Sequence, residues 1–308
     1  WMNSTSGETY ILTDATASSN VWKNVGSGFG DVSKPFGGLG GGTVSGYGSG
    51  GYGPPSDTNV NHIDKYSFTS DGNSSDVANL TVARAEASGN SSATHGYASG
   101  GGNGPLSNVI DKFTFSADAD ATDVGDLTSS RRGSTGCSSS THGYAAGGLT
   151  SVHLNVIDKF SFSVDGNATD VGDLTTGTTY IAGQSSNTHG YASGGYNPPF
   201  NKIERFSFVT DGNATDVGDL TVARYGAGGN SSTTHGYTSG GAHALDIIAK
   251  FSFSSASNAT DIGNLTVGRA YLVGHSSTTH GYSSGSNGTG SNVNTTDAQA
   301  WISPRRWK

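Results

Sequence analysis

The chain has 308 residues, of which 32% are hydrophobic and 13% are charged, and 49 are glycine. Its net charge of −8, with 16 lysines and arginines, argues against a nucleic-acid partner. No apolar run approaches the roughly 18 residues of a membrane-spanning helix, so we expect no membrane insertion. The lone Cys137 excludes a disulfide within the chain and a cysteine-based zinc site.

Residues 1–34 precede the repeated part of the chain. The sequence Trp1-Met2-Asn3-Ser4-Thr5-Ser6-Gly7-Glu8-Thr9-Tyr10, followed by Trp22, resembles a short aromatic hairpin of bacteriophage tail and fibre proteins. That resemblance implies an N-terminal β-hairpin that attaches the protein to other virion proteins.

The rest of the chain is built on a repeat of about 46 residues. The tetrapeptide Thr-His-Gly-Tyr recurs five times, with its histidines at His95, His142, His189, His235 and His280. A degenerate sixth copy occupies Ser45–Gly51. A period of this length with strand-like content predicts a β-propeller in which each repeat forms one blade.

Within one repeat, the pattern predicts four short strands in up-and-down order. The apolar residues of Val156–Phe162 alternate between two faces, which is the period-2 signature of a strand. A turn-forming run at Asp165–Asp170 follows, and a fourth strand is expected at Val171–Leu174. The next blade is expected to open at Tyr180–Gly183.

Three features of the repeat resemble the kelch family: a double glycine that ends a strand, an aromatic strand about a dozen residues later, and an arginine after the fourth strand. The double glycines begin at Gly50, Gly100, Gly147, Gly194 and Gly240, and the arginines are Arg84, Arg131, Arg224 and Arg269. The kelch tryptophan is absent, and Thr178 replaces the arginine in the third copy. The resemblance covers about residues 35–285 and implies a propeller of four-stranded kelch-like blades.

The first strand pair of the repeat occurs six times, but the aromatic strand occurs only five times. Six blades are therefore expected, with five as the alternative. Terminal strands must complete the last blade, and either Asn20–Val25 or Ala298–Ile302 can supply them. The domain organisation is then an N-terminal segment at 1–34, the propeller at 35–285 and a closing segment at 286–308.

Two repeated features suggest metal ligands. The five histidines lie at a turn and not on the strand that lines the channel, so we interpret them as structural. Asp165, Asn167, Asp170 and Asp173 place oxygen atoms at alternating positions, as a calcium loop does, and the run resembles the Asp-box turn of sialidase propellers. Only the second aspartate recurs in every copy, which favours bonding to the turn's own backbone over calcium.

The differences between copies concentrate on one face of the predicted propeller. Loops on this face join the second strand to the third and the fourth strand to the next blade. A repeat protein whose copies differ on one face is expected to bind a ligand there. The candidate binding residues are Tyr52, Pro54, Leu106, Arg131, Arg132, His153, Tyr180, Tyr196, Phe200, Tyr225, His243 and Tyr271.

The expected function is that of a non-enzymatic virion surface protein, without cofactor. It would be a phage tail or fibre component for receptor binding or decoration, and its partners would be a host surface glycan or protein. One alternative is a secreted bacterial lectin or adhesion module located outside the cell. A kelch-type sugar-active enzyme is the third possibility.

Overall fold

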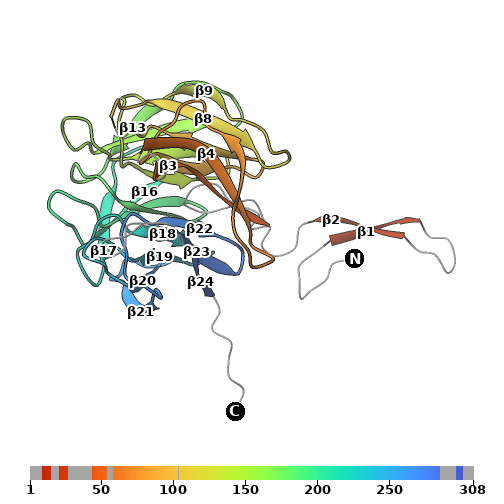
Figure 1. The fold of residues 1–308 in the computed structure, drawn as a ribbon. Coiled ribbons are helices and arrows are strands. Elements are labelled where there is room, and N and C mark those ends of the chain that lie inside the picture. The colour runs from red at the N-terminus through yellow and green to blue at the C-terminus, as the bar shows by residue number, and fades with distance from the viewer. Residues whose placement is uncertain are drawn as a thin grey trace, which may run out of the picture.

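The computed structural model describes residues 9–14, 21–26, 44–53, 58–102, 104–284 and 296–300. All secondary structure in these ranges is β-strand, and no helix in them could cross a membrane. The strands β1 (Thr9–Asp14) and β2 (Val21–Gly26) pair with each other antiparallel. The other strands form six small antiparallel sheets around a common axis (Figure 1). The fold is a six-bladed β-propeller, so the five-bladed alternative is wrong.

The strands keep their order from the axis to the periphery in every blade. The innermost strands are β6 (Ser88–Ser91), β10 (Thr135–Ser138), β14 (Ala182–Ser185), β18 (Gly228–Ser231) and β22 (Val273–Ser276). The second strands are β3 (Ser45–Gly53), β7 (His95–Ser99), β11 (His142–Ala146), β15 (His189–Ser193), β19 (His235–Ser239) and β23 (His280–Ser284). The third strands are β4 (Thr58–Ser67), β8 (Val109–Thr114), β12 (Val156–Ser161), β16 (Lys202–Ser207), β20 (Ile247–Ser252) and β24 (Thr296–Ala300). The outer strands are β5 (Ser75–Asn79), β9 (Thr122–Asp126), β13 (Thr169–Asp173), β17 (Thr215–Asp219) and β21 (Thr260–Asn264).

A strand from the C-terminal region extends the sixth blade, as expected. β24 pairs with β23, so Thr296–Ala300, which overlaps the predicted Ala298–Ile302, supplies the third strand, and this sheet has three strands among the described residues. Asn20–Val25 does not have this role, because β2 pairs with β1. The inner strand β14 begins at Ala182 and not at Tyr180, since Tyr180 has a left-handed backbone with φ of 55° that does not fit a strand.

Neighbouring blades are joined by one side chain at the third position of each inner strand. Asn90 donates to the carbonyl oxygens of Cys137 and Tyr144 in the next blade, at 2.6 and 3.0 Å. The residues at the equivalent position that also donate to the following blade are Cys137, Gln184, Asn230 and His275. Cys137 is therefore a buried hydrogen-bonding group, and burial raises the pKa of its thiol to about 12.

A glycine beside this bridging residue lets the inner strands approach one another closely. A Cβ atom built on Gly136 would lie 1.9 Å from the carbonyl oxygen of Gly89 in the preceding blade, which is far inside a van der Waals contact. The same clash occurs with the preceding blade for Gly183, Gly229 and Gly274. A side chain at these positions would push the blades apart and lengthen the bridging hydrogen bonds.

Aromatic stacking fills the space between blades farther from the axis. In five second strands the tyrosine stacks on the phenylalanine that directly follows the next blade's third strand, with ring centroids 4.7 to 5.0 Å apart and interplanar angles of 18 to 24°. The stacked pairs are Tyr47–Phe115, Tyr97–Phe162, Tyr144–Phe208, Tyr191–Phe253 and Tyr282–Phe68. The last pair joins the sixth blade to the first and closes the ring.

Buried ion pairs connect three of the blade junctions. The arginine after an outer strand reaches a carboxylate on the next blade's third strand in Arg84–Asp111, Arg131–Asp158 and Arg269–Asp297. At two other junctions, one partner of this ion pair is missing. Glu204 faces the junction where Thr178 replaces the arginine, and it accepts a hydrogen bond from the Thr175 backbone instead. Arg224 bonds the carbonyl oxygens of Gly240 and Ile247, because Ala249 occupies the carboxylate position.

An uncharged, buried histidine donates the hydrogen bond that joins the sixth blade to the first. His275 Nε2 donates to the Tyr47 carbonyl oxygen at 2.8 Å, and the Tyr66 ring packs edge-on against the imidazole. Its Nδ1 atom is buried without a partner, so a second proton there would have no acceptor. Burial lowers the pKa of His275 from 6.5 to about 4.

We predict that His275 makes the protein less stable in mild acid. The unfolded chain takes up a proton near pH 6.5 but the folded chain only near pH 4, so the free energy of unfolding falls as the pH drops between these values. The loss should reach about 3 kcal/mol below pH 4. In His275→Asn this component should disappear, because asparagine already forms the same bridge at Asn90 and Asn230. Parallel pH profiles of urea denaturation for the two proteins would contradict this.

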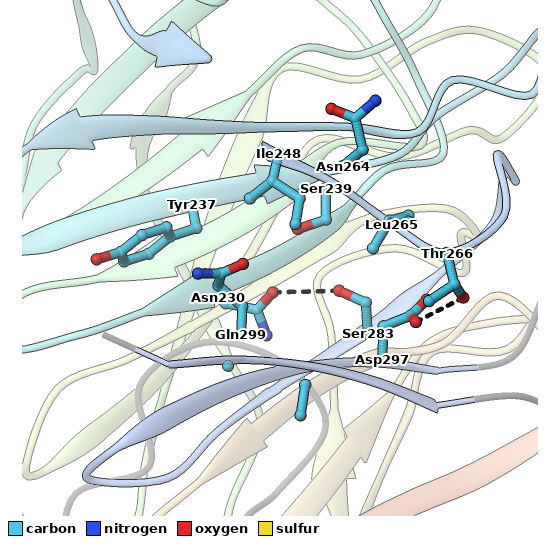
Figure 2. A pocket seen from close by; sticks show the side chains of 12 residues that line it. Asn230, Tyr237, Ser239, Ile248, Asn264, Leu265, Thr266, Ser283, Asp297 and Gln299 are labelled. Atoms are coloured by element: carbon cyan, nitrogen blue, oxygen red, sulfur yellow. Dashed lines mark hydrogen bonds between the residues drawn. The ribbon is translucent and has the colours of Figure 1, made fainter. Parts of the chain in front are cut away.

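The junction between the fifth and sixth blades contains a cavity of about 100 Å³ (Figure 2). Its lining includes Tyr237 from the fifth blade and Gln299 from β24. Gln299 pairs with Gly281 in the register that Phe113 has with Gly96 in the second blade. In the other blades an aromatic ring at this position, Tyr66 in the first blade and phenylalanine in the rest, packs against the preceding blade's tyrosine, as in Tyr97–Phe160. The cavity is thus the space left by a missing aromatic ring.

Replacing Gln299 by phenylalanine should fill this cavity. We expect the free energy of unfolding to rise by about 1–2 kcal/mol, because the new ring would bury apolar surface against Tyr237. Thermal and urea denaturation measure the effect, and Gln299→Ala serves as the control that enlarges the cavity. A destabilised Gln299→Phe variant would show that this junction is not built like the others.

Candidate binding site at the axial mouth

The strand order divides the connections between two faces of the propeller. Turns that join the first strand to the second and the third to the fourth lie on one face, here called the turn face. Loops that join the second strand to the third, and each outer strand to the next inner strand, lie on the opposite face, here called the loop face. Predicted binding residues belong to the loop face, and the repeated histidines and acidic turns belong to the turn face.

On the turn face, the repeated histidines stabilise turns. In all five copies the histidine Nδ1 lies 2.8 Å from the hydroxyl of the preceding threonine. The histidine backbone N–H donates to the hydroxyl of a serine three residues earlier, at 2.9 to 3.0 Å. In the part of the chain that the structure describes, no group of three or more His, Cys, Asp or Glu side chains is placed to hold a metal ion.

The acidic turn uses its oxygen atoms for contacts within the protein. Asp165 accepts a hydrogen bond from Lys112 of the preceding blade at 2.8 Å. Asn167 accepts one from the Asp126 backbone N–H, also of the preceding blade. Asp170 accepts one from the Gly172 backbone N–H two residues later, as expected for a self-stabilised turn. Asp173 pairs with Val156 through the backbone of the sheet. The side-chain contacts described for Asp165, Asn167 and Asp170 are thus hydrogen bonds within the protein.

On the loop face, five equivalent residues form a ring of backbone hydrogen bonds around the axis. Each residue lies just before an inner strand, and each has a left-handed backbone with φ between 55° and 64°. Four of the five, Gly133, Tyr180, Gly226 and Tyr271, donate their backbone N–H to the carbonyl oxygen of the equivalent residue in the preceding blade, at 2.6 to 2.9 Å. The five residues of this mouth ring are Glu86, Gly133, Tyr180, Gly226 and Tyr271.

The mouth ring places side chains where glycine would be the unstrained choice. A left-handed backbone costs a residue with a Cβ atom about 1–2 kcal/mol. Gly133 and Gly226 avoid this cost, whereas Glu86, Tyr180 and Tyr271 do not. Residues held in unfavourable backbone regions cluster at functional sites, so these three positions indicate a function for their side chains.

The three side chains meet at the mouth of the channel. The Tyr180 and Tyr271 rings pack edge to face, with centroids 5.3 Å apart and planes at 82°. The Tyr180 hydroxyl donates to Glu86 Oε2 at 3.2 Å, and Arg132 Nη1 lies 3.6 Å from Glu86 Oε1. The Tyr225 ring centroid is 6.3 Å from those of both Tyr180 and Tyr271. These five residues, Glu86, Arg132, Tyr180, Tyr225 and Tyr271, are here called the axial site.

Aromatic contacts continue from the axial site toward the periphery. The Tyr196 ring centroid lies 4.7 Å from that of Tyr225, and His243 packs against Tyr225 on another side. Tyr196 also contacts His153, whose Nδ1 is 3.0 Å from the side-chain amide of Asn197. Tyr271 and Tyr196 are 47% and 40% exposed, so both present ring surface to solvent.

The hydroxyls of Tyr180 and Tyr271 remain protonated at neutral pH. Burial raises the pKa of Tyr180 to about 12, and burial followed by the charge of Tyr225 raises the pKa of Tyr271. Burial also raises the pKa of Glu86, while Arg132 and the Tyr180 hydroxyl lower it. The site therefore offers phenol donors beside a carboxylate that has an arginine as its counter-ion.

A small polar cavity lies at the axis where the inner strands begin. Its volume is about 120 Å³, and its lining includes Ser88, Ser134 and Thr135. Because the inner strands begin on the loop face, the cavity is on the same face as the mouth ring. The close contacts of Gly89 with Gly136 narrow the channel alongside it.

The structure brings together seven of the predicted binding residues: Arg132, His153, Tyr180, Tyr196, Tyr225, His243 and Tyr271. Tyr52 is 54% exposed at the end of β3, Leu106 is half-buried, and Phe200 packs beneath Lys202. These three are outside the set of joined aromatic rings. Pro54 lies outside the described residues.

The prediction that Arg131 contacts a ligand on the loop face is wrong. Its side chain is fully buried and pairs with Asp158 of the next blade at 3.0 Å. Glu86, in contrast, was missed from the sequence. Aligning the copies by position would have found it, since Glu86, Tyr180 and Tyr271 each stand four residues before the bridging residue of an inner strand.

No protein-family model matches this chain, and no curated protein matches it. The class of protein is therefore defined by the fold, a six-bladed β-propeller with mostly four-stranded antiparallel blades.

We predict an unusual stability order for substitutions at Tyr271. At most positions glycine is less stable than alanine by about 0.5–1 kcal/mol. Here Tyr271→Gly should be more stable than Tyr271→Ala by about 1 kcal/mol, because glycine removes the left-handed strain that alanine keeps. Urea denaturation of the two variants measures the difference. A less stable glycine variant would contradict the assignment of strain to this position.

Proposed function

We propose that this protein is a non-enzymatic binding component of a virion surface. In this proposal it is part of a phage tail or fibre, serves in receptor binding or decoration, and binds a host glycan or protein through the loop face. The observation that carries the proposal is the axial site. Glu86, Tyr180 and Tyr271 of this site occupy strained mouth-ring positions, and its aromatic rings gather on one face of an otherwise regular scaffold.

The composition of the axial site suits recognition. Tyrosine gives a large contact area at a small entropic cost and also supplies a hydroxyl, which is why it is common in binding surfaces. The ring contacts hold Tyr180, Tyr225 and Tyr271 against one another, so little ordering remains to occur on binding. This preorganisation supports a binding role over tolerance of random loop variation.

The virion assignment draws on the N-terminal sequence. Trp1–Tyr10 with Trp22 resembles an aromatic hairpin of phage tail and fibre proteins, and β1 pairs with β2 as an antiparallel hairpin. We propose that this segment attaches the propeller to other virion proteins. The double glycines and arginines of the repeat resemble those of kelch proteins, which supports a kelch-like propeller as the scaffold that this segment attaches.

The leading alternative is a secreted bacterial lectin, which the same aromatic site would serve. A sugar-active enzyme is less well supported by the axial site. Glycoside hydrolysis ordinarily uses two carboxylates, and the axial site as defined here contains only Glu86, which is already engaged by Tyr180 and Arg132.

The proposal predicts that the isolated chain labels bacterial cells through the loop face. The fluorescent protein should bind at least one strain of a diverse bacterial panel, and Tyr180→Gly/Tyr271→Gly should lower binding at least tenfold without unfolding the protein. Val209→Ala, at an exposed turn-face position, is the control that should bind normally. Equal binding by the double variant would rule out the loop-face mouth.

The virion and lectin alternatives are separated by where the protein occurs. Purified phage particles from infected cultures should contain the chain at a fixed, symmetric copy number by quantitative mass spectrometry. A lectin should instead be recovered from the culture medium as a free protein. If this protein is absent from the particles, the virion assignment is overturned. The binding function would then be judged by the cell-labelling experiment alone.

A further inference from the structure

We propose that the ligand is a neutral oligosaccharide, with one terminal sugar in the axial site and the following sugars crossing Tyr225 to Tyr196. This inference rests on the proposed binding function and specifies its ligand. Three observations carry it: the corner formed by two tyrosine rings, the polar pair beside it, and the line of aromatic rings that leads away from the axis.

The corner suits a single pyranose ring. Tyr180 and Tyr271 meet at 82°, so their surfaces are nearly perpendicular, and Tyr271 is about half exposed. Sugar rings carry C–H groups on one face and hydroxyls around the edge. A terminal sugar that rests its C–H face on Tyr271 would present its edge hydroxyls to the groups around it.

Glu86 and Arg132 are placed to form hydrogen bonds with those hydroxyls. A carboxylate has about four acceptor positions, and at Glu86 the structure places one donor on Oε2 and Arg132 beside Oε1. Arg132 carries five N–H donors in a planar fork. Both side chains are about 30% exposed, so each remains accessible. One sugar hydroxyl can donate to Glu86 while a neighbouring hydroxyl accepts from Arg132.

The charge of this pair favours a neutral ligand. Glu86 and Arg132 together carry no net formal charge. A carboxylate or sulfate on the sugar would lie against Glu86, and a cationic group would lie against Arg132. In each case the charged group of the ligand would lose its hydration, and the residue of opposite charge is already paired within the protein, so little is gained in return. Uncharged hydroxyls avoid both costs.

The line of rings indicates more than one sugar. Tyr225 lies next to the corner, Tyr196 lies 4.7 Å beyond Tyr225, and the pair of His153 and Asn197 lies next to Tyr196. Tyr196 comes from a different loop from the mouth-ring residues. An oligosaccharide can contact these rings along its length, with successive sugars on different rings.

The first test uses the bacterial cells that bind the fluorescent protein. Sodium periodate, which cleaves vicinal diols of sugars, should abolish labelling, and proteinase K treatment of the cells should not. Neutral hexose oligosaccharides of two to four residues should compete for binding, and sialyllactose and polygalacturonate should not. The opposite pattern, in which labelling resists periodate but is lost to protease, would overturn the saccharide and leave the binding function standing. Failure to label any cells would instead count against the proposed function itself.

The second test separates the two parts of the site with variants that keep the fold. Glu86→Gln retains the side-chain shape but not the charge, and it should weaken competition by all oligosaccharides at least tenfold. Tyr196→Ala should weaken competition by tetrasaccharides several-fold and leave competition by disaccharides unchanged. Val209→Ala should match the parent protein throughout, and unfolding curves confirm that each variant is folded. The proposal would be overturned if acidic sugars compete better than neutral ones. It would also be overturned if Tyr196→Ala weakens competition equally for oligosaccharides of every length.

Discussion

The propeller depends on a hydrogen bond that one side chain donates across to the next blade at the five junctions where the structure describes an inner strand. Asn90, Cys137 and Asn230 each reach two carbonyl groups of the next blade, as Asn90 does at Cys137 and Tyr144, and Gln184 and His275 each reach one. Such a short side chain can reach only if the inner strands are close, and glycines such as Gly136 allow that approach. The close approach recurs at four junctions, where a Cβ atom on the glycine would lie 1.9 to 2.4 Å from a carbonyl oxygen of the preceding blade, so the spacing of the inner strands is similar there.

This close spacing creates the mouth ring. Equivalent residues just before each inner strand come close enough for backbone hydrogen bonds to run from blade to blade. The left-handed backbone at these positions turns the side chains toward the mouth and not into the sheet. The scaffold therefore holds Glu86, Tyr180 and Tyr271 in contact although they lie far apart in the sequence. Stability and recognition are separated: the junctions stabilise the ring, and the mouth residues carry strain.

The repeat predicted the strands well because each strand's pattern is copied five or six times, and the six blades with a strand from the chain's C-terminal region are confirmed. Details that depend on contacts between blades were not predictable. Arg131 and Arg132 are adjacent and identical in type, yet Arg131 is buried against Asp158 while Arg132 reaches Glu86. Likewise, nothing in the local sequence shows that Gln299 stands where the other blades place an aromatic residue. That follows only from the strand register.

The most direct test of this account is the binding of a variant with an all-glycine mouth ring, Glu86→Gly/Tyr180→Gly/Tyr271→Gly. Glycine already occupies two of the five described ring positions with the same backbone geometry, so the variant should remain folded. The measurement is its binding to cells that the parent protein labels, made at a temperature where unfolding curves show both proteins folded. The account predicts that binding is lost. Binding that persists at the parent level in a folded all-glycine ring would contradict it.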